Sequence, residues 1–431
     1  MQKTALTLEE SARDASSQSC CRICSTPLRR TFLDLGNSPL CESFLEEQKL
    51  DEVEPYYPLK AMVCEKCFLV QLREYVRPEN IFSEYAYFSS FSTSWVAHAK
   101  AYCEMIARRL SLGRDSLVVE LASNDGYLLQ HFLPMGIPVL GVEPAANVAR
   151  VAQDKGIQTV VDFFGVRLAR QMAAQGQSAD LIAGNNVLAQ VPDINDFVAG
   201  IKILMKPAGV VTLEFPHLLR LISEVQFDTI YHEHFSYFSL TTIVNLAERH
   251  ALRVVDVEQL PSHGGSLRVY LAHDGGPHAV SSQVTELLAL ETARGLTDMA
   301  AYSGFSAKVE KVKRDFLAAL IDAREKGLKV AGYGAPGKGN TMLNYCGIGP
   351  DLISFTVDRN PYKHGRFTPG RHIPIRPVEA IDVERPDVVV ILPWNLTREI
   401  TTQMRHIGEW GGRFLVPIPN VSLIDPREIA P

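Results

Sequence analysis

Short apolar runs that alternate with helical segments between residues 117 and 216 constrain the fold of this chain more than any other feature. The run 117–121 is apolar except for one glutamate, which is typical of a parallel strand buried on both faces. A tight turn ending at Gly126 follows, and residues 127–133 continue in a pattern that predicts a helix. Four similar apolar runs follow before residue 216. We therefore expect an α/β fold with a doubly wound parallel sheet and its ligand at the carboxyl ends of the strands.

Polar side chains stand at the ends of these predicted strands. Glu143 ends the second strand about 20 residues after the first turn, where such folds carry the carboxylate that binds ribose. Asp162 ends the third strand, and Asn185 follows the fourth. The first turn is not GxGxxG and no pyrophosphate-binding pattern is present, so these residues leave the ligand open. The stretch "ELASNDG" resembles the first motif of class I S-adenosylmethionine methyltransferases, with Ala122 where that motif usually has its first glycine.

Two Cys-x-x-Cys pairs near the N-terminus predict a zinc site. The cysteines are Cys21, Cys24, Cys64 and Cys67. Each pair brings two thiolates to one ion within a tight turn, and four thiolates close a tetrahedral site. A closed site leaves no position for water, so we expect structural rather than catalytic zinc. The alternative is a redox pair or incidental thiols, and the presence of two pairs favours the metal.

Residues 231–239, "YHEHFSYFS", gather side chains that transfer protons or bind metals. Alternating residues of a strand share a face, so His232 and His234 are able to bind one ion from a strand. The spacing is not that of HExxH, and no third ligand stands out nearby in the sequence. Histidine titrates near neutral pH, so we favour proton transfer over a catalytic metal. A structural role of both histidines is the remaining alternative.

Residues 328–344 repeat the order of strand, glycine-rich loop and helix. The loop brings backbone amides toward an anion at a helix start, and Lys338 is placed to pair with a phosphate. A tight turn with a solvated lysine is the alternative. A short basic loop follows with Arg359, Lys363 and Arg371. In an acidic protein such a loop suits a diphosphate better than a polymer.

The motifs together resemble one family, the nucleotide-sugar C-methyltransferases of deoxysugar and surface-polysaccharide biosynthesis. The matching stretches run in order from about residue 20 to 345: the two cysteine pairs, "SEYAYFSSFS", "VVELASNDGYLL", "GVEPAANVA", "GNNVLAQVPD", "FDTIYHEHFSYFSL", "HGGSLRVY" and "VAGYGAPGKGNTMLN". The resemblance implies an N-terminal zinc module, a central class I methyltransferase domain and a C-terminal Rossmann-like domain that binds the nucleotide sugar. We place these at residues 20–80, 81–305 and 306–431, after a disordered tail of residues 1–19.

The resemblance also implies the ligands. The methyl donor is expected to be S-adenosylmethionine, and the substrate a keto-deoxysugar on a nucleoside diphosphate, often dTDP. Glu143 is expected at the ribose hydroxyls, Asp162 at the adenine amino group and Phe163 near the adenine. The full set implied to line the cofactor site is Glu120, Asn124, Gly126, Glu143, Asp162, Phe163 and Asn185.

For catalysis the resemblance places the general base at His234. This base would remove a proton from the carbon next to a ketone, and the enolate would then take the methyl group. Glu233 would help to position the base or substrate, while Tyr231 would hydrogen-bond the sugar oxygens and Tyr85 would be a further active-site tyrosine. The residues implied to bind the nucleotide sugar are Lys338, Asn340, Arg359, Lys363 and Arg371.

One active-site position departs from the family pattern. Gln190 stands where the family commonly has a histidine. A glutamine donates and accepts hydrogen bonds but does not shuttle a proton at neutral pH. Either Gln190 only orients the substrate, or the chemistry has changed. The alternatives are therefore lyase, isomerase or condensation chemistry on the same scaffold, or a non-enzymatic protein that binds sugar nucleotides.

Charge and hydropathy exclude some partners. The net charge is −6, which argues against nonspecific nucleic-acid binding. No apolar run reaches the ~18 residues that a membrane span needs. The polar N-terminal residues lack the apolar segment of a secretory signal, so we expect a cytoplasmic protein. We also expect a monomer or a small homo-oligomer.

Overall fold

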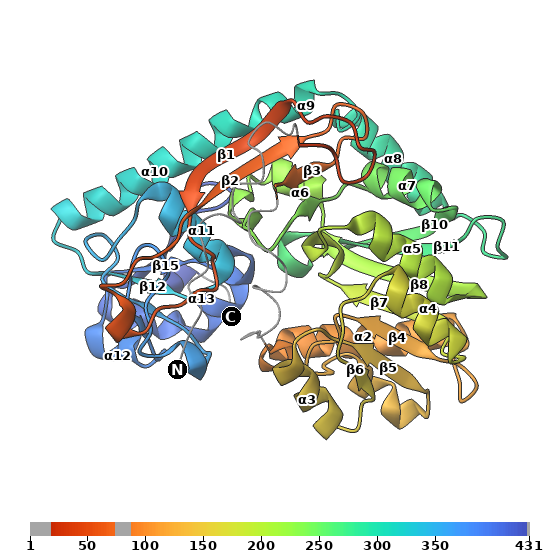
Figure 1. The fold of residues 1–431 in the computed structure, drawn as a ribbon. Coiled ribbons are helices and arrows are strands. Elements are labelled where there is room, and N and C mark those ends of the chain that lie inside the picture. Colours follow the sequence, from red (N-terminus) through yellow and green to blue (C-terminus); the bar gives the residue numbers. More distant parts are fainter. Residues whose placement is uncertain (1–18, 74–87, 429–431) are drawn as a thin grey trace.

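The computed structural model describes residues 19–73 and 88–428 of the chain. Within these residues the strands form three sheets of four, seven and six strands. Figure 1 shows the seven-stranded sheet on one side of the molecule, the six-stranded sheet on the other, and the four-stranded sheet between them at the top. Residues 1–18 of the expected tail (residues 1–19) lie outside the described residues. No helix in the described part of the chain combines the length and apolar character needed to cross a bilayer.

The seven-stranded sheet confirms the predicted methyltransferase-type fold. Its order is β10-β11-β8-β7-β4-β5-β6, and the five strands from β8 to β6 are parallel. Antiparallel β11 and β10 close one edge. The strands are β4 (Val118–Leu121), β5 (Val139–Val142), β6 (Thr159–Val160), β7 (Ala179–Asn185), β8 (Met205–Pro216), β10 (Leu252–Leu260) and β11 (Ser266–His273). The order reverses beside β4, and ligands of such sheets bind at the carboxyl ends near this point.

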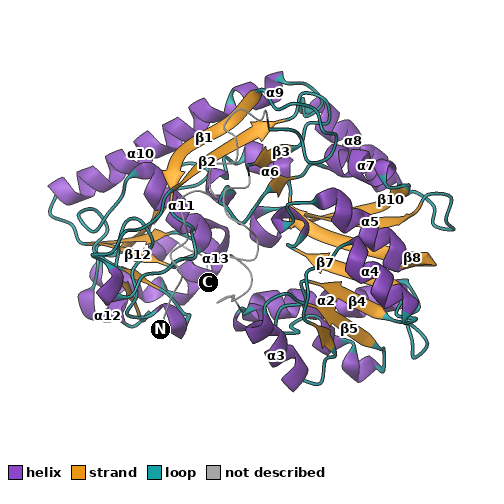
Figure 2. Ribbon diagram, in the orientation of Figure 1, coloured by secondary structure: helices purple, strands orange, loops and turns teal. Residues whose placement is uncertain are grey.

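Helices cover both faces of this sheet (Figure 2). They are α2 (Thr93–Arg109), α3 (Ala146–Asp154), α4 (Val166–Ala174), α5 (Ile194–Leu204), α7 (Leu240–Arg249) and α8 (Ser282–Ala293). Helix α6 (Leu218–Ser223) follows β8 and packs in the apolar cluster of the N-terminal sheet. Several begin at a side-chain cap: the oxygens of Ser92, Asp193 and Ser239 accept amide hydrogen bonds in the first turns of α2, α5 and α7. Such caps satisfy backbone donors that the helix itself leaves unpaired.

The helix predicted directly after the first strand does not form. Residues 127–136 instead make turns and two 3-10 helices, Leu129–His131 and Leu133–Met135. Gly126 turns the chain at φ +76, and Pro134, which has no amide hydrogen to donate, follows soon after. The stretch between them is too short for a stable α-helix, so its apolar side chains pack into the core from turns.

The N-terminal sheet includes a strand from a distant part of the chain. Its order is β1-β2-β3-β9, all antiparallel. The strands are β1 (Arg30–Ser38), β2 (Tyr57–Val63), β3 (Val70–Leu72) and β9 (Ser236–Tyr237). Strand β9 belongs to "YHEHFSYFS" and follows His234 directly, so the cysteine-rich module and this motif share one sheet. The predicted domain boundaries stay predictions.

The C-terminal sheet has a Rossmann-like order, β14-β13-β12-β15-β16-β17, in which only β17 is antiparallel. Its strands are β12 (Val330–Tyr333), β13 (Thr356–Val357), β14 (Ile375–Arg376), β15 (Val388–Ile391), β16 (Arg413–Val416) and β17 (Ser422–Ile424). The helices of this part are α9 (Ala300–Ser303), α10 (Phe305–Glu325), α11 (Gly337–Cys346), α12 (Ala380–Glu384) and α13 (Thr397–Gln403). The predicted strand, glycine-rich loop and helix correspond to β12, residues 334–336 and α11.

Helix α10 joins the N-terminal and C-terminal sheets. In Figure 1 it runs beside β1 and β2 along the outside of the molecule. The ring of Phe32 in β1 stacks on Phe305 of α10 with ring centroids 4.7 Å apart. One buried apolar cluster contains Phe32, Phe305 and Phe316 together with strands of the C-terminal sheet. The zinc module is therefore packed firmly against the C-terminal part of the chain.

Candidate active site

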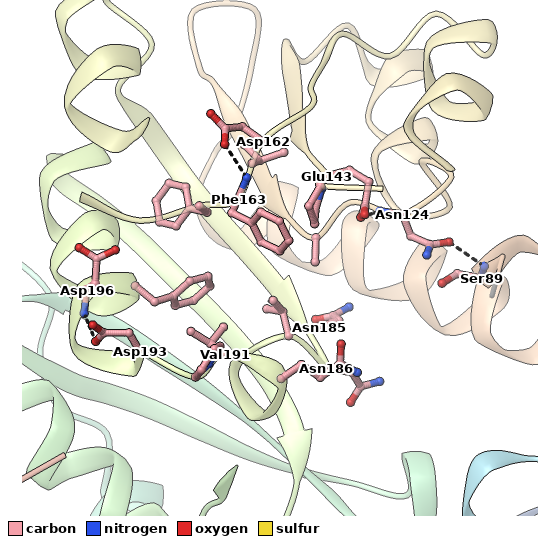
Figure 3. Close-up of a pocket in the computed structure, with 18 of the residues that line it drawn as sticks. Ser89, Asn124, Glu143, Asp162, Phe163, Asn185, Asn186, Val191, Asp193 and Asp196 are labelled. Atoms are coloured by element: carbon pink, nitrogen blue, oxygen red, sulfur yellow. Dashed lines mark hydrogen bonds between the residues drawn. The ribbon is translucent and has the colours of Figure 1, made fainter. Parts of the chain in front are cut away.

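A cavity of about 320 Å³ lies at the carboxyl ends of β4, β5, β6 and β7 (Figure 3). It is large enough for a nucleoside-sized ligand. Five of the seven side chains predicted to bind a cofactor line it: Asn124, Glu143, Asp162, Phe163 and Asn185. Gln190, predicted as a catalytic residue, lines the same cavity. The expected convergence of strand ends on one ligand site is thus present in the structure.

Glu143 is held rigidly in the cavity wall. Its two carboxylate oxygens accept hydrogen bonds from the amides of Asn124 and Ala145, both at 2.9 Å. Burial raises the pKa of Glu143, and these two amide bonds act in the opposite direction by favouring the carboxylate. The free lone pairs of a fixed carboxylate suit the two hydroxyls of a ribose.

The far end of the cavity suits an adenine ring. Phe163 is 38% exposed, although most phenylalanines in this chain are buried, and it lies in the cavity wall. A planar apolar ring in this position is able to pack on a base. Asp162 receives two hydrogen bonds from Arg167, at 2.6 and 2.7 Å, and keeps acceptor capacity for an amino group.

Glu120 and Gly126 lie beneath the cavity rather than in its wall. Glu120 is fully buried in β4, and burial raises its pKa well above the usual range. A Cβ added at Gly126 would approach Ile157 Cδ1 to 2.4 Å, and its φ of +76 also favours glycine. Gly126 therefore shapes the turn that carries Asn124. Ala122 in the same turn has φ +56, a conformation that glycine adopts more easily.

Glu143→Gln is expected to weaken binding of S-adenosylhomocysteine by at least about tenfold. In the glutamine an NH2 group replaces one carboxylate oxygen. This NH2 group would face a backbone N–H, and neither of these two buried donors would then have an acceptor. Isothermal titration calorimetry measures this change. Asp154→Asn, on the exposed side of α3, is the matched control with unchanged affinity. Equal affinity of both variants would contradict a ribose-binding role.

The four predicted zinc ligands converge on one point. The Sγ atoms of Cys21, Cys24, Cys64 and Cys67 all lie within 4.8 Å of one another. Individual Sγ–Sγ distances of 3.4 to 3.6 Å are close to the ~3.8 Å edge of a tetrahedron with zinc–sulfur bonds of ~2.3 Å. The backbone amide of Lys66 also faces Cys64 Sγ at 3.4 Å, as expected for a thiolate. This donor set fits structural zinc, and Cys20 lies outside it.

The histidines of the "YHEH" stretch do not share a metal site. Residues 231–234 form a turn closed by a hydrogen bond from His234 N to the Tyr231 carbonyl, not a strand. His232 Nε2 faces the carbonyl of Pro58 in β2, while His234 turns to other partners. Within residues 19–73 and 88–428, the cysteine cluster is the one group of three or more ligand side chains within reach of a single ion. The metal interpretation of this motif is therefore not supported.

His234 is held as a neutral imidazole with a defined tautomer. Its Nδ1 lies 3.1 Å from the Thr229 carbonyl, which only an N–H can satisfy. Nε2 therefore carries the lone pair, and the Tyr231 hydroxyl lies 2.9 Å from it. Burial lowers the pKa of His234 to about 3, so the ring is uncharged at neutral pH. The structure thus brings Tyr231 and His234 together, whereas Tyr85 lies outside the described residues.

Glu233 points away from His234 into a junction with the zinc module. The Cys41 thiol donates to Glu233 Oε1 at 3.7 Å. Burial and, as a smaller effect, the nearby carboxylate of Glu42 raise the pKa of Glu233 to about 8. Lys363 of the C-terminal part lies 3.6 Å from Glu42 and completes this junction of three chain regions.

Glu233→Gln is expected to be more heat-stable than the native chain at pH 8 but similar to it near pH 5. A folded-state pKa above the unfolded value of ~4.3 favours the protonated carboxyl, so native stability falls as the pH rises from about 4 to 8. Glutamine mimics the protonated carboxyl, so the variant should not lose stability as the pH rises. Thermal unfolding at both pH values measures it, with Glu248→Gln on the exposed surface of α7 as control. A pH-independent difference between native chain and variant would contradict the assignment.

The predicted substrate residues occupy different positions around α11. Lys338 is its second residue. Lys363 donates to the Ala335 carbonyl just before the helix, and Arg359 is more than half exposed and lies 3.4 Å from Glu399. Asn340 donates to the Cys41 carbonyl and so anchors the zinc module to α11. Arg371 donates to the carbonyls of residues 347 and 348, at the opposite end of α11 from Lys338.

Sequence reasoning missed several groups at this site. Asn186 lines the cofactor cavity and its amide nitrogen lies 2.8 Å from Nε2 of His263, a residue with left-handed φ of +55. Trp95 also lines the cavity and its ring lies 4.9 Å from that of His263. The sequence signal for Asn186 was its place directly after a predicted strand. No sequence signal placed Trp95 there, because it reaches the cavity from a helix distant in the chain.

The sheet order, the ribose-type carboxylate after β5 and the cavity at the strand ends define a class I S-adenosylmethionine-dependent methyltransferase. Family models match three consecutive parts of the chain: "Putative zinc binding domain" at residues 21–82, "Methyltransferase domain" at 95–257 and "C-methyltransferase C-terminal domain" at 261–419. The C-methyltransferase NovU of Streptomyces niveus is 36% identical over 404 residues, which cover 94% of this chain and 96% of that protein. The chain belongs to this family of zinc-containing C-methyltransferases.

Solved structures of methyltransferases align with about two fifths of the chain. Magnesium protoporphyrin IX methyltransferase of Synechocystis PCC 6803 with bound cofactor is 13% identical and has a TM-score of 0.31 over 42% of this chain and 81% of that one. The 1,6-didemethyltoxoflavin-N1-methyltransferase of Burkholderia thailandensis is 17% identical, with a TM-score of 0.30 over 41% and 76%.

Proposed function

We propose that this C-methyltransferase acts on a keto-deoxysugar carried on a nucleoside diphosphate, and that it methylates the carbon next to the ketone with His234 as general base. The observation that carries the proposal is the state of His234. It is neutral, its Nδ1–H is fixed by a carbonyl, and its Nε2 lone pair is directed at a hydroxyl. The lone pair on Nε2 is the feature that a general base needs. Burial lowers the pKa of the free imidazole and so weakens it as a base, and the ketone next to the carbon must therefore make the proton acidic enough to be removed.

The residues divide into a cofactor part and a substrate part. Glu143, Phe163 and Asn185 would hold S-adenosylmethionine, which when bound supplies an electrophilic sulfonium methyl group. Gln190 lines the same cavity, where its amide is able to orient the substrate without moving a proton. Arg359 and Lys363 would contact the diphosphate from the C-terminal part, where their positive charges lie on one loop.

Tyr231 and His234 would act in sequence. In the absence of substrate the tyrosine hydroxyl donates to the lone pair of His234 Nε2. When that hydroxyl turns to a sugar oxygen, Nε2 is free to accept a proton from carbon. The Thr229 carbonyl stabilises the imidazolium that forms, because Nδ1–H already donates to it. The residues thus remove the proton and orient the sugar.

Incubation with isotopically labelled S-adenosylmethionine and several dTDP-linked keto-deoxysugars tests the proposal. We expect the label in a new carbon–carbon bond next to the ketone, identified by mass spectrometry and NMR of the product. Product formed without consumption of the methyl donor would instead favour the lyase, isomerase or condensation chemistry that Gln190 suggests. Binding of both ligands with no product of any kind would favour a non-enzymatic role.

A further inference from the structure

The ammonium group of Lys338 is enclosed by side chains of the C-terminal sheet. Its Nζ donates to Asn395 Oδ1 at 2.8 Å and lies 5.0 Å from the centre of the Trp394 ring. Both partners follow β15 at its carboxyl end. A lysine that binds a diphosphate would extend into the basic loop with Arg359 and Lys363. The contacts of the Lys338 ammonium lie after β15, whereas Lys363 of the basic loop donates to the Ala335 carbonyl.

A short chain of contacts connects Lys338 to the proposed base. The indole N–H of Trp394 donates to Asp228 Oδ2 at 2.7 Å. Asp228 is completely buried, and its second oxygen, Oδ1, has no hydrogen-bond partner in the described part of the chain. Asp228 and Thr229 belong to one 3-10 helix, Phe227–Thr229, and the Thr229 carbonyl accepts from His234 Nδ1. The lysine and the imidazole are therefore held by one rigid unit.

The same unit reaches the cofactor cavity. Gly264 has φ +90 and packs so closely on Trp394 that an added Cβ would lie 2.5 Å from its ring. Its neighbour His263 contacts Asn186, which lines the cavity. The positive charge of Lys338 contributes to lowering the pKa of both His234 and His263, after the larger effect of burial. Contacts thus connect the ammonium to both imidazoles, through Trp394, Asp228 and Thr229 to His234 and through Trp394 and Gly264 to His263.

We propose that Lys338 stabilises the negative charge that develops on the ketone oxygen of the substrate when His234 removes the adjacent proton. This inference rests on the function proposed above. In this step the carbon–hydrogen bond breaks and an N–H bond forms at His234 Nε2. The electron pair forms a carbon–carbon double bond, and the carbonyl π pair moves to oxygen. An ammonium group already in place there lowers the barrier, because no solvent has to reorganise around the new charge.

Asp228 keeps this lysine charged. Burial lowers the pKa of Lys338, and Asp228 acts in the opposite direction through its own charge. Burial raises the pKa of Asp228 to about 6, so its carboxylate is ionised at higher pH. Asp228 thus favours the charged form of Lys338 without accepting a hydrogen bond from it, and among the described residues the only hydrogen-bond acceptor for the ammonium is the amide oxygen of Asn395. Such a group suits an oxygen that becomes an anion only during the reaction.

Exchange of the substrate carbon-bound hydrogen for deuterium tests the inference without methyl transfer. The full-length protein is incubated in heavy water with dTDP-linked keto-deoxysugars and S-adenosylhomocysteine, and exchange is followed by NMR. We expect Lys338→Met to slow exchange by about 100-fold at saturating substrate, as for loss of one such stabilising group. Lys338→Arg, which keeps the charge, should recover part of that loss. Affinity for dTDP alone, measured by calorimetry, should stay within about twofold for Lys338→Met, because the lysine is not a diphosphate ligand.

Lys313→Met is the matched control. Lys313 also lies over an aromatic ring, 4.5 Å from the centre of Tyr345, and donates to a carbonyl, but it belongs to α10 away from the site. Its variant should exchange at the native rate. The inference on Lys338 would be overturned, with the proposed function intact, if Lys338→Met exchanged at the native rate. A large loss of dTDP affinity with normal exchange at saturating substrate would overturn it in the same way. Absence of exchange in the native protein with every keto-sugar would overturn the proposed function and this inference with it.

Discussion

His234→Asn is expected to lower turnover and deuterium exchange by about 100- to 10,000-fold, the range found for loss of a general base. The asparagine amide is able to donate to the Thr229 carbonyl as Nδ1–H does now, so the turn of residues 231–234 should keep its shape. What the variant lacks is the basic lone pair at the position of Nε2. The effect should therefore appear in the rate of proton removal and not in the binding of either ligand.

Two measurements separate this from a folding defect. Calorimetry with S-adenosylhomocysteine should give native affinity, because the residues that line the cofactor cavity do not include His234. His250→Asn, at the end of α7 and hydrogen-bonded to Asn195, is the matched control with native turnover. A His234→Asn protein that exchanges deuterium at the native rate would remove this residue from its proposed role.

Cys64→Ser is expected to abolish both zinc binding and methyl transfer, although no cysteine of the cluster takes part in the reaction. Structural zinc contributes about 10 to 16 kcal/mol in isolated zinc-finger peptides, more than the stability of a typical domain. Serine is not a zinc ligand of comparable strength, so three remaining thiolates leave an open, weaker site. The N-terminal sheet should then lose its order.

The loss should reach the active site through direct contacts. Arg22, between Cys21 and Cys24, donates to the carbonyls of Leu72 in β3 and of Phe235 next to His234. It also donates to the carbonyl of Pro192 in the wall of the cofactor cavity. Strand β3 pairs with β9, which begins two residues after the turn of residues 231–234. Zinc thus holds the turn of residues 231–234 in place from a distance.

Metal analysis, limited proteolysis and an activity assay test this expectation together. The Cys64→Ser protein should contain little zinc, be cleaved within residues 20–72 and show no turnover. Cys20→Ser changes an exposed cysteine next to the cluster and should keep zinc and activity. A Cys64→Ser protein with full activity and no zinc would show that the metal is dispensable for the catalytic turn.

The sequence was sufficient to predict the cofactor cavity for a simple physical reason. Parallel strands end at one edge of a sheet, so Asn124, Glu143, Asp162 and Asn185, each at or just after the end of a strand, had to come together. The zinc ligands were predictable because two Cys-x-x-Cys pairs indicate a metal site far more specifically than one pair does. The family resemblance, now confirmed, added the donor and the C-methylation.

Other features depended on contacts that no local pattern encodes. The prediction of a helix after the first strand was wrong, because too few residues lie between a left-handed glycine and a proline to form one. The "YHEH" stretch forms a turn and not a strand. His232 therefore contacts the Pro58 carbonyl, whereas His234 contacts the Thr229 carbonyl and the Tyr231 hydroxyl. Asp228 and Trp394 had no sequence signal, since their hydrogen bond joins residues 166 positions apart.

The amino-acid order alone determined three units of this protein, namely a four-cysteine metal site and two α/β sheets, because hydrophobic periodicity and ligand spacing are local properties. Tertiary structure alone decided how these units meet. Burial at their junction shifts the pKa values of His234, Glu233 and Asp228, and the fold places the Lys338 ammonium on Asn395. Desolvation and charge pairing depend on all neighbours in space, and most of those neighbours are distant in the chain.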